Sequence, residues 1–423
     1  MGDNLTRRRN CPASLMSSFS PAQRHFDIVV IGAGPAGLSF ALALERTGLS
    51  VAIVEPQSHE HLARPPFDGR EIALTHASIE RLRQLGVWLR IPTEEISPLR
   101  IARVVNGARS EGLDLQHPRA SSDALAQLVS NHLIRRALYE RIDGLRNVEL
   151  ICGARVAAIH PAARASDIEL SDGTRLSAAL VVAADSRFSE SRTAMGIAAR
   201  IRDFGRTMTL FRAECDRPHD GIAYEWFDHG QTIALLPLNG NLRSVVLTLP
   251  SDEARRLLAL GDEAFDREVE RRSAPRVRIR RVSPHFSYPV VTVYASRFVA
   301  TRYALIGDAA VGMHPVTAHG FNLGLLGTAT LANLVAKAAA TGQDIGSDAV
   351  LAAYEREHRR ATLPFYLATN AIVELYTQEA LPLRIARDAL LRIGNRATPI
   401  KKALTAFLTR GAPDLGRPSS VRG

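Results

Sequence analysis

The first organised stretch of the chain is a short apolar run that leads into a glycine-rich turn. Residues 28–31, Ile-Val-Val-Ile, have the apolar character of a strand that is buried on both faces. The turn occupies residues 32–37, and an apolar helical pattern then continues to Gly48. Residues 51–54 predict a second strand, which ends at Glu55. This order of strand, turn, helix and strand predicts a βαβ unit in a parallel sheet.

The turn reads Gly-Ala-Gly-Pro-Ala-Gly, which has the G-x-G-x-x-G spacing of dinucleotide-binding sites. The first glycine permits a tight turn, the second lets backbone amides approach a pyrophosphate, and the third lets the helix lie close to the strand. Proline suits the first helical turn, and an acid that ends the next strand can hold a ribose hydroxyl. Incidental glycines in an ordinary strand-turn-helix are the alternative. The cofactor-binding residues that this pattern predicts are Gly32, Gly34, Pro35, Ala36, Gly37 and Glu55.

A second glycine-containing segment lies much later in the chain, at residues 304–324. It reads ALIGDAAVGMHPVTAHGFNLG, with Gly307-Asp308 directly after an apolar run. Glycine-rich turns are common, so either segment alone is weak evidence. The combination of a dinucleotide turn with a late Gly-Asp segment predicts one flavin site to which both contribute.

Between these segments the hydrophobic pattern changes from helical to alternating. Residues 71–86 and 122–144 predict helices, whereas residues 148–182 predict several short strands. Residues 208–249 alternate as antiparallel strands do, and Asn239-Gly240 predicts a hairpin turn. The expected fold class is therefore α/β: a Rossmann-like domain with an interleaved antiparallel-sheet domain and a C-terminal helical segment.

Length and composition fit this picture. With 423 residues, of which 46% are apolar, the chain can form about two to three domains with a sizeable core. The three cysteines, Cys11, Cys152 and Cys215, lie far apart, so neither a disulfide framework nor a metal site is expected. The sequence shows no signal-peptide core and no apolar run near the roughly 18 residues that span a bilayer. We expect a cytoplasmic protein, or one that is peripheral on the inner face of the membrane.

The net charge of +10 is concentrated at the two ends of the chain. Residues 1–24 contain four arginines and one aspartate, and residues 381–423 contain nine basic and two acidic residues. Residues 25–380 are therefore formally neutral, which argues against a nucleic-acid-binding face. Residues 1–24 have no core-forming pattern and are expected to be disordered, and Met16 is an alternative start.

The basic C-terminal region contains an amphipathic pattern at residues 398–411. Its apolar positions recur at helical spacing, and Lys401, Lys402 and Arg410 lie beside them. A basic amphipathic helix can lie on an anionic membrane surface. Packing of its apolar face on the rest of the protein is an equally good interpretation.

Three motifs together resemble those of the single-component FAD-dependent aromatic hydroxylases. They are GAGPAG at residues 32–37, VVAADSRFSESR at residues 181–192 and RYALIGDAAVGMHP at residues 302–315. The resemblance spans roughly residues 26–409 and is greatest to the ubiquinone-biosynthesis hydroxylases, in particular their UbiM branch. It implies non-covalently bound FAD, NAD(P)H as co-substrate, and no metal. In this family O2 adds to the reduced flavin, and the resulting C4a-hydroperoxide passes its distal oxygen to an electron-rich ring.

The resemblance also implies a substrate and partners. The substrate would be a polyprenylated quinol precursor of ubiquinone, and other ubiquinone-biosynthesis proteins would be partners. Substrate choice depends on the shape of the pocket, so hydroxylation of a soluble aromatic compound is an alternative. A non-catalytic quinone-binding or scaffold subunit with the same fold is the alternative from a different class.

The domain division that follows from the resemblance is discontinuous. The FAD-binding domain comprises residues 25–98, 122–195 and 290–345. The substrate domain comprises residues 99–121 and 196–289, the C-terminal helices residues 346–412, and the tail residues 413–423.

Matched residue by residue, the resemblance implies further flavin contacts. Asp308, in Gly307-Asp308, matches the acid that bonds the ribityl chain. Pro315 matches the residue beside the reactive edge of the flavin and is a candidate catalytic residue. Asn322 and Gly324 match positions after that turn, where a helix N-terminus would offer amides to the pyrimidine oxygens of the flavin, and Gly320 is a further expected cofactor contact.

Two arginines and an aspartate complete the implied cofactor site. Arg70 matches an arginine near the cofactor, and Arg135 matches a polar residue near the pyrophosphate. Both have a plainer alternative as surface arginines. Asp185 belongs to the second motif, where an Asp-Gly pair is usual, but this chain has Asp185-Ser186. A serine restricts the turn that a glycine would allow.

The third motif also departs from the family. Val311 stands where a histidine is usual, and Ala318-His319-Gly320 replaces Gly-Gln-Gly. His319 is a candidate catalytic base for proton removal from a phenol, and a histidine that only bonds a neighbouring carbonyl is the alternative. In the alternating region Tyr224 and Trp226 are candidate substrate contacts, although core packing is the commoner fate of such residues.

Overall fold

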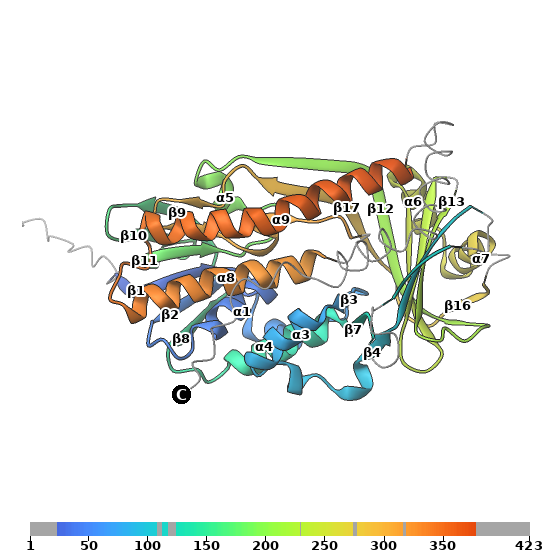
Figure 1. Cartoon of the computed structure of the whole chain (residues 1–423), viewed down its shortest axis with the longest axis horizontal. Coiled ribbons are helices and arrows are strands. Elements are labelled where there is room, and N and C mark those ends of the chain that lie inside the picture. Colours follow the sequence, from blue (N-terminus) through green and yellow to red (C-terminus); the bar gives the residue numbers. More distant parts are fainter. Residues whose placement is uncertain are drawn as a thin grey trace, which may run out of the picture.

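The computed structural model describes residues 23–107, 112–116, 124–228, 230–273, 277–315 and 319–377. Figure 1 shows two halves side by side, each built on its own β-sheet. We call them the parallel-sheet half, on the left of the view, and the antiparallel-sheet half, on the right. A third, three-stranded sheet lies between them.

The parallel-sheet half is organised around the apolar run at the start of the chain. β1 (Arg24–Ile31) pairs in parallel with β2 (Val51–Glu55) on one side and with β11 (Arg175–Ala183) on the other. Val29 and Val30 are fully buried, as expected for a parallel strand with both faces covered. The other strands of this sheet are β8 (Val148–Cys152), β9 (Val156–Pro161), β10 (Ser166–Leu170), β18 (Val299–Ala300) and β19 (Tyr303–Leu305).

Helices pack on this sheet. α8 (Gly320–Ala340) lies between α1 (Pro35–Ala43) and α9 (Asp348–Thr377), as Figure 1 shows. α8 is long and apolar enough to cross a membrane, but its side chains Leu331 and Val335 are fully buried in the core of this half. The other helices here are α2 (His59–Ala63), α3 (His76–Gln84), α4 (Asn131–Ile142) and α5 (Glu190–Ala194).

The antiparallel-sheet half contains the alternating region of the sequence. Its strands are β5 (Ile101–Asn106), β6 (Leu113–Gln116), β12 (Ala199–Cys215), β13 (Ile222–Asp228), β14 (Gln231–Pro237), β15 (Leu242–Pro250), β16 (Ile279–Arg281), β17 (Phe286–Ala295) and β20 (Val311–Gly312). Their order is β20-β17-β12-β15-β14-β13-β5-β6, and β16 pairs with β12. The hairpin expected at Asn239-Gly240 joins β14 to β15.

The two faces of this sheet have different neighbours. α6 (Ser251–Leu258) and α7 (Asp262–Ser273) cover one face, which we call the outer face. There Phe211 and Trp226 of the sheet form an apolar cluster with Phe265 of α7. The opposite face, which we call the inner face, is turned toward the rest of the molecule.

The three-stranded sheet packs against the inner face. It consists of β3 (Glu71–Leu74), β7 (Ala126–Ser130) and β4 (Ser97–Leu99), with β7 in the centre. Leu128 of β7 belongs to the same apolar cluster as Ala223 of β13. This cluster fixes the small sheet to the antiparallel-sheet half.

A buried ion pair strengthens that connection. Glu71 Oε1 accepts hydrogen bonds from Arg212 Nε at 3.0 Å and Nη2 at 2.8 Å, and Glu71 Oε2 accepts one from Ser130 Oγ at 2.7 Å. Burial raises the pKa of Glu71, and the neighbouring Arg212 charge opposes that shift. Removal of Arg212 would leave the buried Glu71 carboxylate without its charged partner, so the pair holds β3 in a fixed position relative to β12.

The α/β fold class expected from the sequence is confirmed, but two local expectations are wrong. The helices expected at residues 71–86 and 122–144 begin later than the pattern indicates, at His76 and Asn131. The preceding residues form β3 and β7, which pair with each other, so tertiary pairing overrides the helical pattern there. Residues 1–22 and 378–423, including the amphipathic pattern at 398–411, lie outside the described residues.

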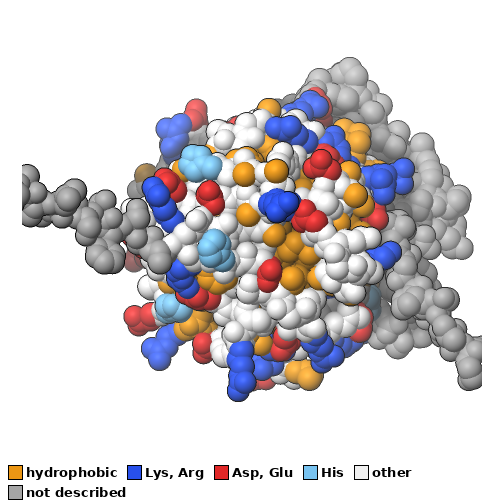
Figure 2. Space-filling model, turned by 90° about the vertical axis from the view of Figure 1, so that its left-hand side faces the viewer, with side chains coloured by type: hydrophobic (Ala, Val, Ile, Leu, Met, Phe, Trp, Pro, Cys, Tyr) orange, Lys and Arg blue, Asp and Glu red, His pale blue; other side chains and the backbone are white. Residues whose placement is uncertain are grey.

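Figure 2 shows the end of the molecule that carries the parallel sheet. Basic and acidic side chains are interspersed over this face, with small apolar areas between them. The view agrees with the formally neutral charge of the chain between its two basic ends.

Candidate functional site

The glycine-rich turn after β1 is packed so closely that two of its glycines have no room for a side chain. Gly32 has φ +103°, and a Cβ atom there would lie 2.7 Å from the carbonyl oxygen of Ala184, at the end of β11. A Cβ atom on Gly37 would lie 2.0 Å from the carbonyl oxygen of Gly32. Backbone fills both spaces, so these two glycines shape the turn.

Gly34 differs from Gly32 and Gly37, the other two glycines of the turn. A Cβ atom there would meet nothing within 4 Å. Gly34 is the N-cap of α1, and Pro35 occupies the first turn. The first turn of a helix presents backbone amides that have no acceptor within the helix, and the helix dipole favours an anion at that point. The open space beside Gly34 therefore fits the pyrophosphate of a dinucleotide.

Glu55 holds the turn from the end of β2. Its side chain is 8% exposed. Oε2 accepts a hydrogen bond from Ala33 N at 2.7 Å, and Oε1 accepts one from Gln57 N at 3.1 Å. A carboxylate oxygen can accept more than one hydrogen bond. The bonds to the backbone therefore leave the predicted contact with a ribose open.

The structure brings Arg70 and Arg135 into the same region as Glu55. Arg70 Nη2 donates to Asp68 Oδ2 at 2.6 Å, and its guanidinium lies 5.4 Å from the ring centre of Tyr288. Burial lowers the pKa of Arg135; the Asp68 and Glu55 carboxylates oppose this shift, and the Arg70 charge adds to it. The two arginines thus lie near the end of β2, where an anionic cofactor group would meet both charges.

The second motif is tied together by Asp185. Its Oδ1 accepts a hydrogen bond from Ser189 Oγ at 2.6 Å, and its Oδ2 accepts from Ser191 Oγ at 2.8 Å and Ser191 N at 3.1 Å. Ser186 has φ +78°, the left-handed conformation that the glycine of the usual motif would adopt without strain. The serine at this position therefore holds a backbone conformation that is strained for a residue with a side chain.

The third motif meets the first at another glycine contact. Gly307 has φ +58°, and a Cβ atom on it would lie 2.8 Å from the Cβ atom of Ala36 in α1. A Cβ atom on Gly324 of α8 would lie 3.4 Å from the Cα atom of Gly307. The late Gly-Asp segment and the early turn therefore lie against each other, as the combined pattern predicts for one site.

Arginines link the second motif to the third. Arg187 Nη2 bonds to Asp308 Oδ2 at 2.8 Å, and Arg192 Nη1 donates to the carbonyl oxygen of Ala309 at 2.9 Å. Burial lowers the pKa of Arg192. Sequence reasoning missed Arg187 as a partner of the predicted flavin acid. Its position directly after Ser186, within a motif already recognised, was the available signal.

The residues after Asp308 lead to the start of α8. Pro315 is exposed and directly precedes residues 316–318, which lie outside the described residues. His319, the N-cap residue of α8, is 2% exposed, and its ring centre lies 5.2 Å from that of Phe365 in α9. Gly320 begins α8. The assignment of Pro315 to the reactive edge of the flavin and of His319 to proton transfer stays a prediction.

Asn322 connects α8 to β3 and to the residue that caps α3. Its Nδ2 donates to the carbonyl oxygen of Ala73 at 2.9 Å, and its Oδ1 accepts from Thr75 N at 3.1 Å. Thr75 is the N-cap of α3. The Asn322 side chain thus positions the N-terminus of α8, and a contact between its backbone amide and a flavin oxygen stays a prediction.

The structure does not bring Tyr224 and Trp226 to the three motifs. Trp226 is buried in the apolar cluster on the outer face of the sheet, and Tyr224 packs against the same cluster. Their ring centres lie 5.2 Å apart. Arg103 Nη1 donates to the Tyr224 hydroxyl at 3.4 Å. Both side chains therefore lie between the sheet and its covering helices.

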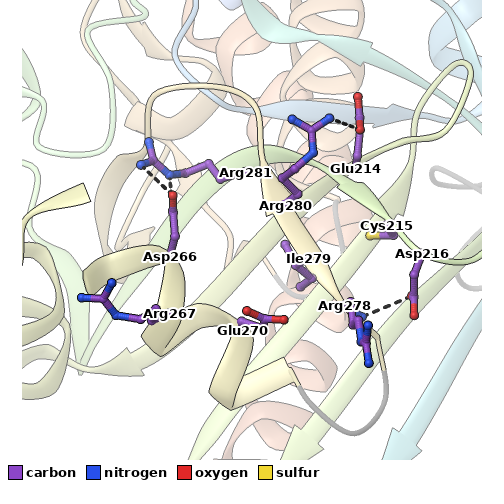
Figure 3. A pocket seen from close by; sticks show the side chains of 10 residues that line it. All are labelled: Glu214, Cys215, Asp216, Asp266, Arg267, Glu270, Arg278, Ile279, Arg280 and Arg281. Atoms are coloured by element: carbon purple, nitrogen blue, oxygen red, sulfur yellow. Dashed lines mark hydrogen bonds and ion pairs between the residues drawn. The ribbon is translucent and has the colours of Figure 1, made fainter. Parts of the chain in front are cut away.

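A surface depression at the far end of the antiparallel-sheet half is also separate from the motifs. Figure 3 shows charged side chains from β12, α7 and β16 around it. Arg281 bonds to Asp266 at 2.6 Å, and Arg280 pairs with Glu214. These charges satisfy one another, and no residue of the three glycine-containing motifs lines the depression.

The open space beside Gly34 leads to a first prediction. Gly34→Ala should change the free energy of unfolding of the cofactor-free protein by less than about 1 kcal/mol, because the backbone there is extended and the space is free. The same methyl group would occupy the pyrophosphate position and raise the Kd for FAD at least about tenfold. Urea unfolding and flavin fluorescence titration measure the two effects.

Gly37→Ala is the matched control for that prediction. Its methyl group would clash with backbone, so it should destabilise the cofactor-free protein by about 1–3 kcal/mol. Unchanged FAD affinity of Gly34→Ala would contradict the assignment of the pyrophosphate to this space.

The conformation of Ser186 leads to a second prediction. Ser186→Gly should stabilise the protein by about 0.5–1 kcal/mol, because relief of left-handed strain outweighs the added entropy of the unfolded chain. Ser186→Ala keeps the strain and should bring no such gain. Chemical denaturation of the three proteins tests this, and equal stability of the glycine and alanine variants would refute the strain.

Comparisons with known proteins agree with this geometry. The family model described as the FAD binding domain matches residues 25–363. The ubiquinone hydroxylase UbiM of Neisseria meningitidis is 43% identical over 390 residues, which cover 91% of this chain and 85% of that protein. The ubiquinone hydroxylase UbiL of Rhodospirillum rubrum is 35% identical over 383 residues, with coverage of 90% and 89%.

A solved structure shows the same fold. The p-nitrophenol 4-monooxygenase PnpA from Pseudomonas putida superimposes with a TM-score of 0.75 and covers 92% of this chain and 99% of its own. Its 19% identity supports the fold alone. Together with the three converging motifs and the extended sequence matches, this shows that the chain belongs to the FAD-binding-domain family that includes UbiM and UbiL, and that it is an FAD-dependent monooxygenase.

Proposed function

We propose that this protein hydroxylates the aromatic ring of a polyprenylated ubiquinone precursor, with NAD(P)H and O2 as co-substrates. The observation that carries the proposal is the similarity to ubiquinone hydroxylases along nearly the whole chain. The three motifs support it, because residues from distant parts of the sequence form one site that fits FAD. We call this site, formed by residues 32–37, 185–192 and 307–308, the flavin cradle.

The residues that would hold FAD are divided among the three motifs. Gly34 and the amides at the start of α1 would take the pyrophosphate, and Glu55 would take a ribose. Asp308 would take the ribityl chain, and Arg187 holds its carboxylate in place. Bound FAD supplies the electron transfer from NAD(P)H and the activation of O2.

The protein must also keep water away from the reacting ring. The inner face of the antiparallel sheet provides an apolar surface for this purpose, with Leu210 of β12 paired with Phe286 of β17 on one side and with Val246 of β15 on the other. A prenylated ring that displaces water from such a surface gains free energy from the burial of its apolar area. The substrate would therefore lie between this face and the cradle.

The direct test is turnover by the purified protein with its FAD bound. We expect 2-geranylphenol to stimulate NADH or NADPH oxidation and to gain one oxygen atom, as measured by absorbance and mass spectrometry. Asp308→Ala should lower product formation at least about a hundredfold, because the flavin loses its ribityl contact. A flavin-loaded protein that oxidises NAD(P)H only with a soluble aromatic acid would contradict the prenylated substrate.

We also infer that the protein is cytoplasmic and binds peripherally to the membrane that holds such a substrate. The support is the basic amphipathic pattern at residues 398–411. Deletion from Ala397 onward should abolish sedimentation with anionic liposomes while FAD stays bound. Equal sedimentation of the full and shortened chains would contradict this membrane role.

A further inference from the structure

The inner face of the antiparallel sheet carries an acidic side chain that none of the motifs includes. Along β13, side chains alternate between the two faces. Trp226 points to the outer face, where it joins the cluster under α6 and α7. Ala223 points to the inner face, where it packs with Leu128 of the small sheet. Glu225 has the same parity as Ala223 and therefore lies on the inner face.

The inner face looks onto the segment that carries Arg70. The Tyr288 hydroxyl of β17 donates to the carbonyl oxygen of Asp68 at 2.9 Å. A Cβ atom on Gly69 would lie 2.8 Å from the ring of Phe286 and 3.3 Å from Leu210. The same face that carries Glu225 thus continues directly to the region of the flavin cradle.

The immediate neighbours of Glu225 on this face are apolar. Its cross-strand partners are Ala234 on β14 and Val104 on β5, and Val246 on β15 follows Ala234 in the same row. Glu225 is half-buried, and its carboxyl group makes no hydrogen bond or ion pair with any residue that the structure describes. A polar group in such surroundings gains from a partner that a ligand supplies.

These surroundings decide the charge of the group. Burial raises the pKa of Glu225 to about 8. The charged and titratable groups on this face and on the elements packed against it include Arg206, Arg212, Tyr288, Asp68, Arg70, Glu71 and His132, and burial alone accounts for the shift. At neutral pH the carboxyl group is therefore mostly protonated, and a protonated carboxyl has one O–H donor as well as acceptor oxygens.

We propose that Glu225 is a substrate-binding residue whose carboxyl group donates a hydrogen bond to an oxygen substituent on the aromatic ring. The chemical class of ligand is an aromatic ring that bears an acceptor oxygen, such as a methoxyl or carbonyl group. This contact fixes the rotation of the ring in its plane and so selects the carbon presented to the flavin. The inference rests on the proposed function, since it assumes that the ring lies on the inner face.

The sign of the pH dependence follows from the donor. Below the pKa the carboxyl group is neutral and can donate, whereas above it the carboxylate can only accept. An ether oxygen can only accept a hydrogen bond. Binding of an aromatic ether should therefore weaken as pH rises through about 8, whereas binding of the corresponding hydrocarbon should not.

The experiment compares two probes, 2-geranylanisole and geranylbenzene, by the change that each causes in the absorbance of the bound flavin. The wild-type protein should bind the ether about fivefold to tenfold more tightly than the hydrocarbon at pH 6.5 and lose this preference at pH 9.5. Glu225→Gln keeps an N–H donor and should keep the preference at both pH values. Glu225→Leu should show no preference at either pH.

Glu214→Gln is the matched control, because it makes the same substitution on an exposed glutamate of the same sheet that pairs with Arg280. It should behave as the wild type does. The proposal is overturned if Glu225→Leu keeps the ether preference, or if the wild type shows no such preference. It is also overturned if Glu225→Gln loses the ether preference at pH 9.5 as the wild type does.

Failure of the proposed function has a different signature. Binding of both probes is read from the oxidised flavin and needs no turnover. A protein that shows the expected ether preference but does not hydroxylate 2-geranylphenol would contradict the proposed reaction and leave the role of Glu225 in ligand binding supported. The reverse result, hydroxylation without the ether preference, would overturn the role of Glu225 alone.

Discussion

The site depends on close contacts at glycine positions, where a side chain would have no room. Gly32 faces the end of β11, Gly37 faces the turn itself, and Gly307 lies against Ala36 of α1. Any larger residue at these points would push apart segments that are distant in sequence. Because the segments touch, the N-terminus of α1 and the Asp308 carboxylate share one region, and a single cofactor can reach both.

Charge pairing then orders the polar groups around this contact. Arg187 joins the second motif to Asp308, and Asp68 holds Arg70 beside Tyr288. Burial would raise the pKa of Asp68, but hydrogen bonds from Arg70 and Asn131 hold it below its usual range. These pairs hold the polar groups in and around the cradle in fixed positions, which lowers the entropy that cofactor binding must overcome.

The sequence predicts those parts of this arrangement that depend on local geometry. Strand, turn and helix at residues 24–43 follow from an apolar run and from glycines whose spacing has a steric reason. The late Gly-Asp segment is recognisable for the same reason. The strands at 71–74 and 126–130 are not, because each exists through pairing with the other and not through its own residues.

Side-chain direction is the second limit of sequence reasoning. Aromatic character pointed to Tyr224 and Trp226 as pocket residues, yet strand parity places them under α6 and α7. The residue between them, Glu225, has the inner position, and its neighbours in the row come from three other strands. Alternation along one strand shows that two faces exist, but only the assembled sheet shows which face meets the cradle.

A crystal structure of the protein with FAD bound tests the central claim most directly. The account predicts that the pyrophosphate lies beside Gly34 at the N-terminus of α1 and that Asp308 contacts the ribityl chain. The isoalloxazine ring of FAD should then extend toward the inner face of the antiparallel sheet. A pyrophosphate bound away from Gly34, or a ribityl chain out of reach of Asp308, would contradict the convergence of the three segments on one cofactor.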